Sequence, residues 1–169
     1  MITVGILTVS DAGFRGERVD ESGPAIRKIV TERLKAEVVD YAIVPDEREM
    51  IEETLIEWAD ERGIDLILTT GGTGFAPRDV TPEATSAIIE REVPGLGEAM
   101  RAQGLEVTPH AMLSRAAAGI RGKSLIINLP GSPKAVVESL NTILPALPHG
   151  LEILKEEPGA WERHRYEDK

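Results

Sequence analysis

The stretch Asp65-Leu-Ile-Leu-Thr-Thr-Gly-Gly-Thr-Gly-Phe-Ala-Pro-Arg-Asp-Val-Thr-Pro-Glu83 decides how this chain folds. It begins with the apolar run 66–68, whose length and character are typical of a buried strand. Glycines follow at 71, 72 and 74, where the backbone is free to take positive φ and to let another molecule approach closely. After the charged pair Arg78-Asp79, Thr81-Pro82 has the pattern of a helix N-cap with proline at the first helical position. This order of elements is typical of an anion-binding site at the carboxyl end of a strand in an open α/β sheet.

Two familiar phosphate-binding motifs are excluded for this glycine turn. A P-loop requires Gly-Lys-Ser or Gly-Lys-Thr, which does not follow Gly71, and a dinucleotide fingerprint requires a third glycine where this chain has Pro77. The plain alternative is a tight turn between a strand and a helix. Such a turn needs neither three glycines nor an Arg-Asp pair, so the pattern favours a binding site.

The rest of the chain alternates between strand-like and helix-like segments. Strands are predicted at 2–9, 38–44, 64–70, 116–120 and 124–129, and helices from Pro24, after Asp46, from Thr81, at 96–103, after Pro133 and at 147–155. The alternation predicts a mostly parallel sheet covered on both faces. The short turn 121–123 predicts a hairpin, and therefore at least one antiparallel strand.

Length and composition limit the classes of protein. The 169 residues suit one compact domain, which we assign to residues 1–155, followed by a charged tail at 156–169 that we expect to be mobile beyond Pro158. The chain has no cysteine, which excludes a disulfide framework, thiol catalysis and Cys-ligated zinc. No signal-peptide pattern precedes the first strand and no apolar run approaches the roughly 20 residues of a membrane span, so we expect a cytoplasmic protein without membrane contact.

The formal net charge of −10 argues against general nucleic-acid binding, which needs a basic surface. The same charge repels phosphates at long range. An anion site in this chain must therefore rely on local groups, namely helix N-termini, Arg78, Lys134 and a bound cation. Arg15 and Arg18, in the loop after the first strand, are expected to be solvated rather than to bind a ligand.

Four predicted strand ends carry polar or glycine-rich turns: Ser10-Asp11, Pro45-Asp46, residues 71–79 and residues 130–134. In a parallel sheet all these ends lie on one edge, where they can converge on one crevice. Asp46 also fits a helix cap with Glu49 as its capping-box partner, whereas no helix requires Asp79. Two carboxylates beside bound phosphates fit Mg²⁺, which binds through one or two carboxylates plus substrate oxygens. Ser132-Pro133 fits both a plain helix start and a phosphate-binding turn.

Together these motifs resemble the molybdopterin adenylyltransferase family, the MogA and MoaB type that also includes the G domain of gephyrin-like proteins. Residues 69–85 are similar to the family signature almost letter for letter. Further similar segments are 10–11 with 20–23, 112–115, 119–123, 128–132 and 144–149. The resemblance extends over nearly the whole chain to about Leu154.

The resemblance implies a three-layer α/β/α sandwich, usually a trimer, that acts in molybdenum cofactor biosynthesis. The implied reaction transfers AMP from ATP to the phosphate of molybdopterin with Mg²⁺ and releases pyrophosphate. The two functional aspartates of the family correspond to Asp46 and Asp79, which would hold the metal. The remaining implied contacts are phosphate binding by Gly71, Gly72, Thr73 and Gly74, the pterin side by Ser114, Pro130, Gly131, Ser132 and Lys134, and first-loop contacts by Ser10, Asp11, Asp20 and Ser22.

Three alternatives to the enzyme stay open at this point. One is a molybdopterin-binding carrier or regulatory module without catalysis. Another is a nucleotide or pyrophosphate hydrolase on the related CinA-like domain, and the third is a scaffold trimer. The presence of both aspartates favours the enzyme. The chain has no second domain for molybdate insertion, so the resemblance also implies a separate MoeA-like partner.

Overall fold

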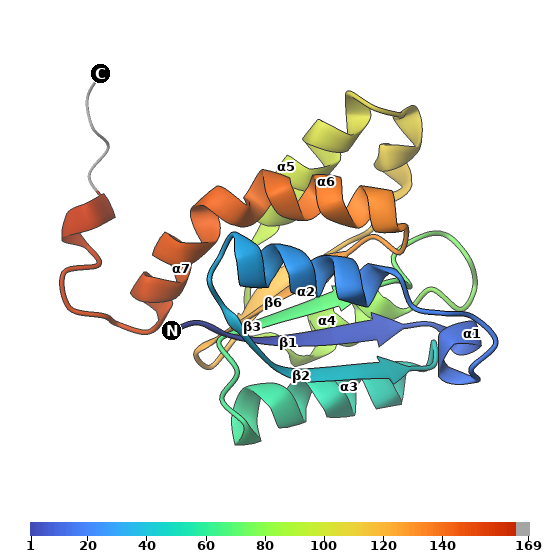
Figure 1. Ribbon diagram of the computed structural model, residues 1–169, viewed down its shortest axis with the longest axis horizontal. Coiled ribbons are helices and arrows are strands. Elements are labelled where there is room, and N and C mark those ends of the chain that lie inside the picture. Colours follow the sequence, from blue (N-terminus) through green and yellow to red (C-terminus); the bar gives the residue numbers. More distant parts are fainter. Residues whose placement is uncertain (165–169) are drawn as a thin grey trace.

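The computed structural model describes residues 1–164 and shows a six-stranded mixed sheet (Figure 1). Its strands are β1 (Thr3–Val9), β2 (Glu37–Val44), β3 (Leu66–Thr70), β4 (Arg91–Glu92), β5 (Ala118–Arg121) and β6 (Ser124–Leu129). Their order is β2-β1-β3-β6-β5-β4. The first four strands in this order run parallel, and β5 pairs antiparallel with both β6 and β4. The predicted parallel sheet with an antiparallel hairpin is therefore confirmed.

Helices cover both faces of the sheet and make the fold a three-layer α/β/α sandwich (Figure 1). One face packs against α2 (Ser22–Glu32), α5 (Pro94–Leu105), α6 (Pro133–Ile143) and α7 (Leu147–Leu154), and the other against α3 (Arg48–Ile56) and α4 (Thr81–Ile88). Short helical turns complete the structure: α1 (Asp11–Phe14), a π-helical turn (Glu57–Glu61) and 3₁₀ turns at Pro109–Leu113, Leu144–Ala146 and Glu162–His164.

The two hydrophobic cores follow from the alternation of side chains along the central strands. In β1, Val4 and Ile6 face the α2 and α6 layer, whereas Leu7 and Val9 face the α3 and α4 layer. All four are buried, as expected for a parallel strand covered on both sides. The site-bearing turns at the ends of these strands therefore stand on a rigid base.

The structure differs from the sequence-based expectation at the far edge of the sheet. Between α4 and α5 the chain forms the two-residue strand β4, which the sequence analysis did not predict. Two residues are too few for a periodic pattern to be read. α5 then begins at Pro94 itself, with proline at the first helical position, two residues earlier than predicted.

The end of the chain lies close to the domain over part of its length. Ala160 is buried, and Lys123 forms an ion pair with Glu156. Residues 165–169 of the predicted tail lie outside the described residues. Within residues 1–164, no helix is both long and apolar enough to cross a membrane.

Candidate functional site

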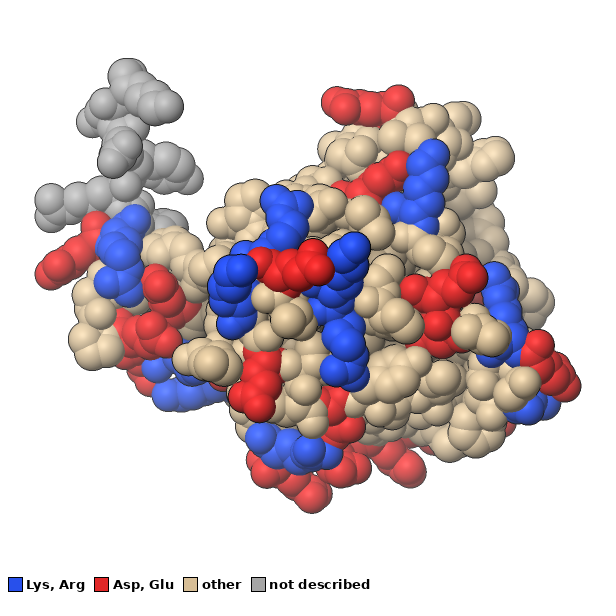
Figure 2. Space-filling model, in the orientation of Figure 1, with Lys and Arg blue, Asp and Glu red and all other residues tan. Residues whose placement is uncertain are grey.

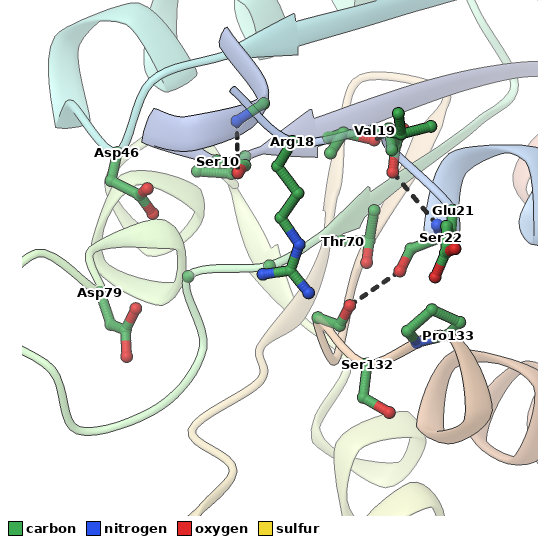
Figure 3. Close-up of a pocket in the computed structure, with 17 residues that line it drawn as sticks. Ser10, Arg18, Val19, Glu21, Ser22, Asp46, Thr70, Asp79, Ser132 and Pro133 are labelled. Carbon is green, nitrogen blue, oxygen red and sulfur yellow. Dashed lines mark hydrogen bonds between the residues drawn. The ribbon is translucent and has the colours of Figure 1, made fainter. Parts of the chain in front are cut away.

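The main cavity lies at the carboxyl ends of β1, β2, β3 and β6, where the four predicted turns converge (Figure 3). Its volume is about 390 Å³. The chain runs from β1 to β2 on one side and then crosses to β3 on the other side of β1, so the cavity lies at the switch point of the sheet. Open α/β sheets bind ligands at this place.

The glycine turn after β3 adopts a backbone that only glycine accommodates. Gly71 and Gly72 have φ angles of +94° and +68°. A Cβ atom on Gly71 would lie 2.3 Å from the carbonyl oxygen of Val9, and one on Gly72 would lie 2.3 Å from the hydroxyl of Thr81. Thr81 uses that hydroxyl to donate to the Gly71 carbonyl at 2.9 Å. The predicted N-cap role of Thr81 is therefore wrong, because its side chain holds the glycine turn instead.

Asp46 is free of the helix that follows it. The cap of α3 is Glu47, which makes no side-chain cap bond, so the capping-box reading of Asp46 is wrong. The Asp46 carboxylate instead accepts from the Asp11 amide at 2.9 Å, and the Asp11 carboxylate accepts from the Asp46 amide at 3.0 Å. Arg78 donates two hydrogen bonds to Asp11, at 2.6 and 2.9 Å. This arrangement ties the turns after β1 and β2 together and leaves one Asp46 oxygen for a ligand.

The pKa values of Asp11 and Asp46 are shifted in opposite directions. The hydrogen bonds from Arg78 lower the pKa of Asp11 to about 2. Partial burial raises the pKa of Asp46, and the negative charges of Asp11 and Asp79 raise it further, although the Asp11 amide and Arg78 oppose the change. A bound cation would therefore stabilise the ionised form of Asp46. Asp79 lines the same cavity and could bind the same cation.

Asp79 is positioned by its own turn and by Arg115. Its carboxylate accepts from the amide of Ala76 at 3.0 Å. The Arg115 guanidinium donates to the carbonyl oxygens of Gly74 and Asp79, both at 2.8 Å, and pairs with Glu83. Arg115 therefore clamps both ends of the loop that carries Asp79.

Asp20 holds the first loop against the sheet. Its carboxylate accepts from the hydroxyls of Thr8 and Tyr41 and from the amides of Ser22 and Gly23. Partial burial opposes ionisation, but these hydrogen bonds outweigh it and lower the pKa of Asp20. Partial burial, together with the same carboxylate, raises the pKa of Tyr41 to about 12. Asp20 lines the cavity, yet its hydrogen-bonding capacity is taken up by the protein.

The hydroxyl groups around the cavity divide into two kinds. Thr70 donates to the carbonyl of Pro130 and Ser22 to that of Gly131, both at 2.7 Å. Their hydroxyl protons are therefore already engaged within the protein. Ser10 and Ser132 accept cap bonds from Gly13 and from Ala135. An accepting hydroxyl keeps its proton to donate. Ser132 is thus the N-cap of α6, as predicted, and it also lines the cavity.

The predicted site residues fall into three groups. The cavity brings together Ser10, Asp20, Ser22, Asp46, Gly71, Gly72, Asp79, Gly131 and Ser132. Ser114 and Pro130 line a second cavity of about 240 Å³ on the other side of the 130–133 turn. Asp11, Thr73, Gly74 and Lys134 line neither; Lys134 lies near Glu138 at 3.9 Å.

The second cavity contains an unusual polar atom. The side-chain oxygen of Gln103, which lines it, is buried and has no hydrogen-bond partner within residues 1–164. Buried polar atoms are rarely left unpaired. This oxygen is itself buried, so it is not an exposed acceptor of the cavity that Gln103 lines. Most of the surrounding side chains are apolar or small, among them Met100, Ala111 and Ala116.

The donor set at the main cavity fits Mg²⁺ rather than a metal held by the protein alone. Within residues 1–164, no group of three or more His, Asp or Glu side chains is placed to hold a metal ion. Asp46 and Asp79 line one cavity, and the negative charge of Asp79 is one of the causes that raise the pKa of Asp46. A magnesium ion bound through two carboxylates, with substrate phosphates and water as its other ligands, matches this pattern.

Sequence reasoning missed two residues of the site. Arg115 lies in the family-like segment 112–115, but nothing in its sequence neighbourhood indicates that it reaches Gly74, 41 residues earlier. Arg18 was expected to be solvated, but it lines the cavity (Figure 3). No local signal distinguishes it from Arg15, because acidic residues lie beside both in the sequence; only the fold shows that Arg15 pairs with Glu17 while Arg18 lines the cavity.

The fold and the cavity together define an open-sheet α/β protein with a polar, ligand-sized cavity at the carboxyl ends of its parallel strands. Residues 5–149 match the family described as the probable molybdopterin binding domain. The chain belongs to this family, which confirms the resemblance seen in its motifs.

Relatives of known name agree with this assignment. A molybdopterin adenylyltransferase of Helicobacter pylori is 47% identical over 154 residues, which cover 90% of this chain and 88% of the relative. Gephyrin of Dictyostelium discoideum is 45% identical over 98% of this chain, which corresponds to 24% of gephyrin. The crystal structure of the molybdopterin biosynthesis enzyme MoaB from Thermus thermophilus superimposes with a TM-score of 0.88 at 57% identity, over 94% of this chain and 99% of that one.

Proposed function

We propose that this protein is a molybdopterin adenylyltransferase of molybdenum cofactor biosynthesis, which transfers AMP from ATP to the phosphate of molybdopterin. The observation that carries the proposal is the placement of Asp46, Asp79 and the glycine turn around one cavity at the strand ends. The relatives named as this enzyme and matched over most of their length support it.

The reaction requires positioning more than covalent help from the protein. An oxygen of the molybdopterin phosphate forms a bond to the α-phosphorus of ATP, the bond from that phosphorus to the bridging oxygen breaks, and pyrophosphate leaves. The attacking phosphate is already anionic near neutral pH, so no general base is needed. Holding two phosphates in line supplies most of the acceleration in such transfers.

We assign the nucleotide phosphates to the main cavity. Ser10 and Ser132 line this space, as does Pro133 at the start of α6, so their hydroxyl groups and the N-terminus of that helix would stabilise negative charge there. Asp46 and Asp79 would hold Mg²⁺, which supplies neutralisation of the phosphate charge and of the leaving pyrophosphate. This local charge balance offsets the repulsion expected from a protein of net charge −10.

We assign the pterin to the second cavity, on the other side of the 130–133 turn. The mostly apolar and small side chains that line this cavity suit the planar faces of a pterin ring. A homotrimer and a MoeA-like protein that receives the adenylylated product belong to the same proposal.

The test is turnover of molybdopterin, ATP and Mg²⁺ by the wild type and by Asp79→Asn, with adenylylated pterin and pyrophosphate measured. The asparagine keeps an oxygen that accepts from Ala76, so the loop stays in place while the charge is lost. Product from the wild type, a fall of about 100-fold or more in the variant and unchanged pterin binding are expected. Tight pterin binding without product from either protein would leave a binding module, and ATP loss without pterin would indicate a hydrolase.

A further inference from the structure

We propose that Arg18 binds the phosphate chain of the nucleotide substrate. The inference rests on the proposed function, and it adds a substrate-binding residue that the motifs of the chain do not contain. It starts from the charges around the main cavity. Among the described residues that line the cavity, Arg18 is the one basic side chain, whereas Asp20, Glu21, Asp46 and Asp79 are acidic.

The cations that the sequence offered for this role are occupied elsewhere. Arg78 is held by Asp11 through two hydrogen bonds, and Lys134 lies outside the cavity beside Glu138. The guanidinium of Arg115 is hydrogen-bonded to the glycine loop and paired with Glu83. Arg78 and Arg115 thus donate to other groups of the protein, and none of the three lines the main cavity.

Arg18 differs from them because its guanidinium makes no hydrogen bond or ion pair with any residue in the range 1–164. On the face seen in Figure 2, basic side chains lie among acidic ones, and pairing is the common state of arginine in this protein. In Figure 3 the Arg18 side chain extends into the cavity, and its guanidinium lies between Asp79 on one side and Ser132 on the other. A free guanidinium with five donors in this position matches the geometry of phosphate oxygens.

The position also distinguishes between the two substrates. Arg18 lines the cavity that holds the two carboxylates, and it does not line the second cavity, where Ser114 and Gln103 lie. The nucleotide brings the larger phosphate charge into the first cavity. Arg18 is therefore assigned to ATP and not to molybdopterin.

The experiment compares Arg18→Gln with Arg15→Gln. Arg15 is on the same loop and the substitution removes the same charge, but Arg15 is paired with Glu17 and does not line the cavity. Binding of ATP with Mg²⁺ is measured by titration calorimetry, the Michaelis constant for molybdopterin by turnover, and folding by thermal unfolding. Because Arg18 is exposed and makes no hydrogen bond or ion pair within the described chain, its loss should leave the melting temperature nearly unchanged.

We expect Arg18→Gln to weaken ATP binding about 10- to 100-fold, the range for loss of a charge-assisted hydrogen bond. Arg15→Gln should weaken it less than about threefold, as expected for an exposed charge, and the Michaelis constant for molybdopterin should stay the same in both. Equal effects of the two variants, or an effect of Arg18→Gln confined to molybdopterin, would overturn the assignment. If the wild type turns over normally and Arg18→Gln binds ATP as tightly as the wild type, the role of Arg18 is refuted and the proposed function stands. If the wild type does not bind ATP, the proposed function is refuted as well.

Discussion

Replacement of Arg115 by methionine tests whether the glycine loop is held by one side chain. Methionine keeps the length of the side chain but removes the donors to the carbonyls of Gly74 and Asp79 and the pairing with Glu83. A hydrogen bond from a charged group contributes about 1.5–3 kcal/mol when buried. The Arg115 side chain is 34% exposed and its partner Glu83 is 43% exposed, so the low end applies to the two carbonyl bonds and almost nothing to the ion pair.

The free energy of unfolding should therefore fall by about 2–3 kcal/mol, which corresponds to about 4–12 °C in melting temperature for a chain of this length. Because the loop carries Asp79, adenylyl transfer should fall by at least about tenfold under conditions where the variant is still folded. Thermal unfolding and turnover at a temperature well below both transitions measure the two effects.

Arg121→Met is the matched control for this experiment. Arg121 donates to the carbonyl of Ile88 at 2.7 Å and to Asp60 at 2.6 and 2.9 Å. Ile88 is the last residue of α4, at the opposite end of that helix from the glycine loop. By the same reasoning Arg121→Met should lose about 1.5 kcal/mol, for its one bond to a carbonyl, and keep full turnover. The reasoning is refuted if Arg115→Met keeps wild-type turnover, or if both variants lose activity to the same degree.

Three further predictions concern charge and backbone at the cavity. Burial and neighbouring carboxylates raise the pKa of Asp46, so its negative charge destabilises the folded protein at neutral pH. Asp46→Asn should therefore increase the melting temperature while turnover falls about 100-fold or more. A variant that is both less stable and fully active contradicts this. Because the pKa of Asp11 is lowered to about 2, its stabilising contribution is present above about pH 4 and is lost as the pH falls toward 2. The difference in melting temperature between the wild type and Asp11→Asn should narrow over that interval, and a constant difference argues against the Arg78 pairing as its source. Gly71→Ala should lower the free energy of unfolding in urea by about 2 kcal/mol or more, since it adds a clash with Val9 to left-handed backbone strain; Gly16→Ala, with open space around it, should cost only the strain of about 1–2 kcal/mol.

Much of the fold was predictable because each central element carries its own local signal. The β5–β6 hairpin turn contains Gly122, whose φ is +55°, and the helix start at Ser132-Pro133 formed as the sequence indicated. The convergence of four strand ends followed from the general geometry of parallel sheets once the strands were identified. Such signals are read over a few neighbouring residues, which is why they survive without knowledge of the rest of the chain.

The incorrect predictions concern side chains whose partners are distant in sequence, because tertiary contacts there override the local pattern. Asp46 has the local sequence of a helix cap, but its carboxylate meets the amide of Asp11, 35 residues away. Thr81 also has a cap sequence, and its hydroxyl meets the Gly71 carbonyl instead. Arg115 and Arg18 have no local pattern at all, since their surroundings come from distant turns. The roles of such side chains can be identified only from the folded structure, which shows which residues they contact.

The hydrogen bonds that join the turns around the cavity determine how the site responds to heat. The turn after β2 is bonded to the turn after β1 through Asp46, Thr70 of β3 is bonded to the turn after β6, and that turn is bonded to Ser22 of α2. These three links join the ends of core strands and the start of α2, so the walls that they connect cannot separate without breaking hydrogen bonds. The conformational entropy of ordering the site is therefore spent when the domain folds, and not when substrate arrives. Formation of the binding site and folding of the domain are one cooperative event, so thermal inactivation coincides with global unfolding.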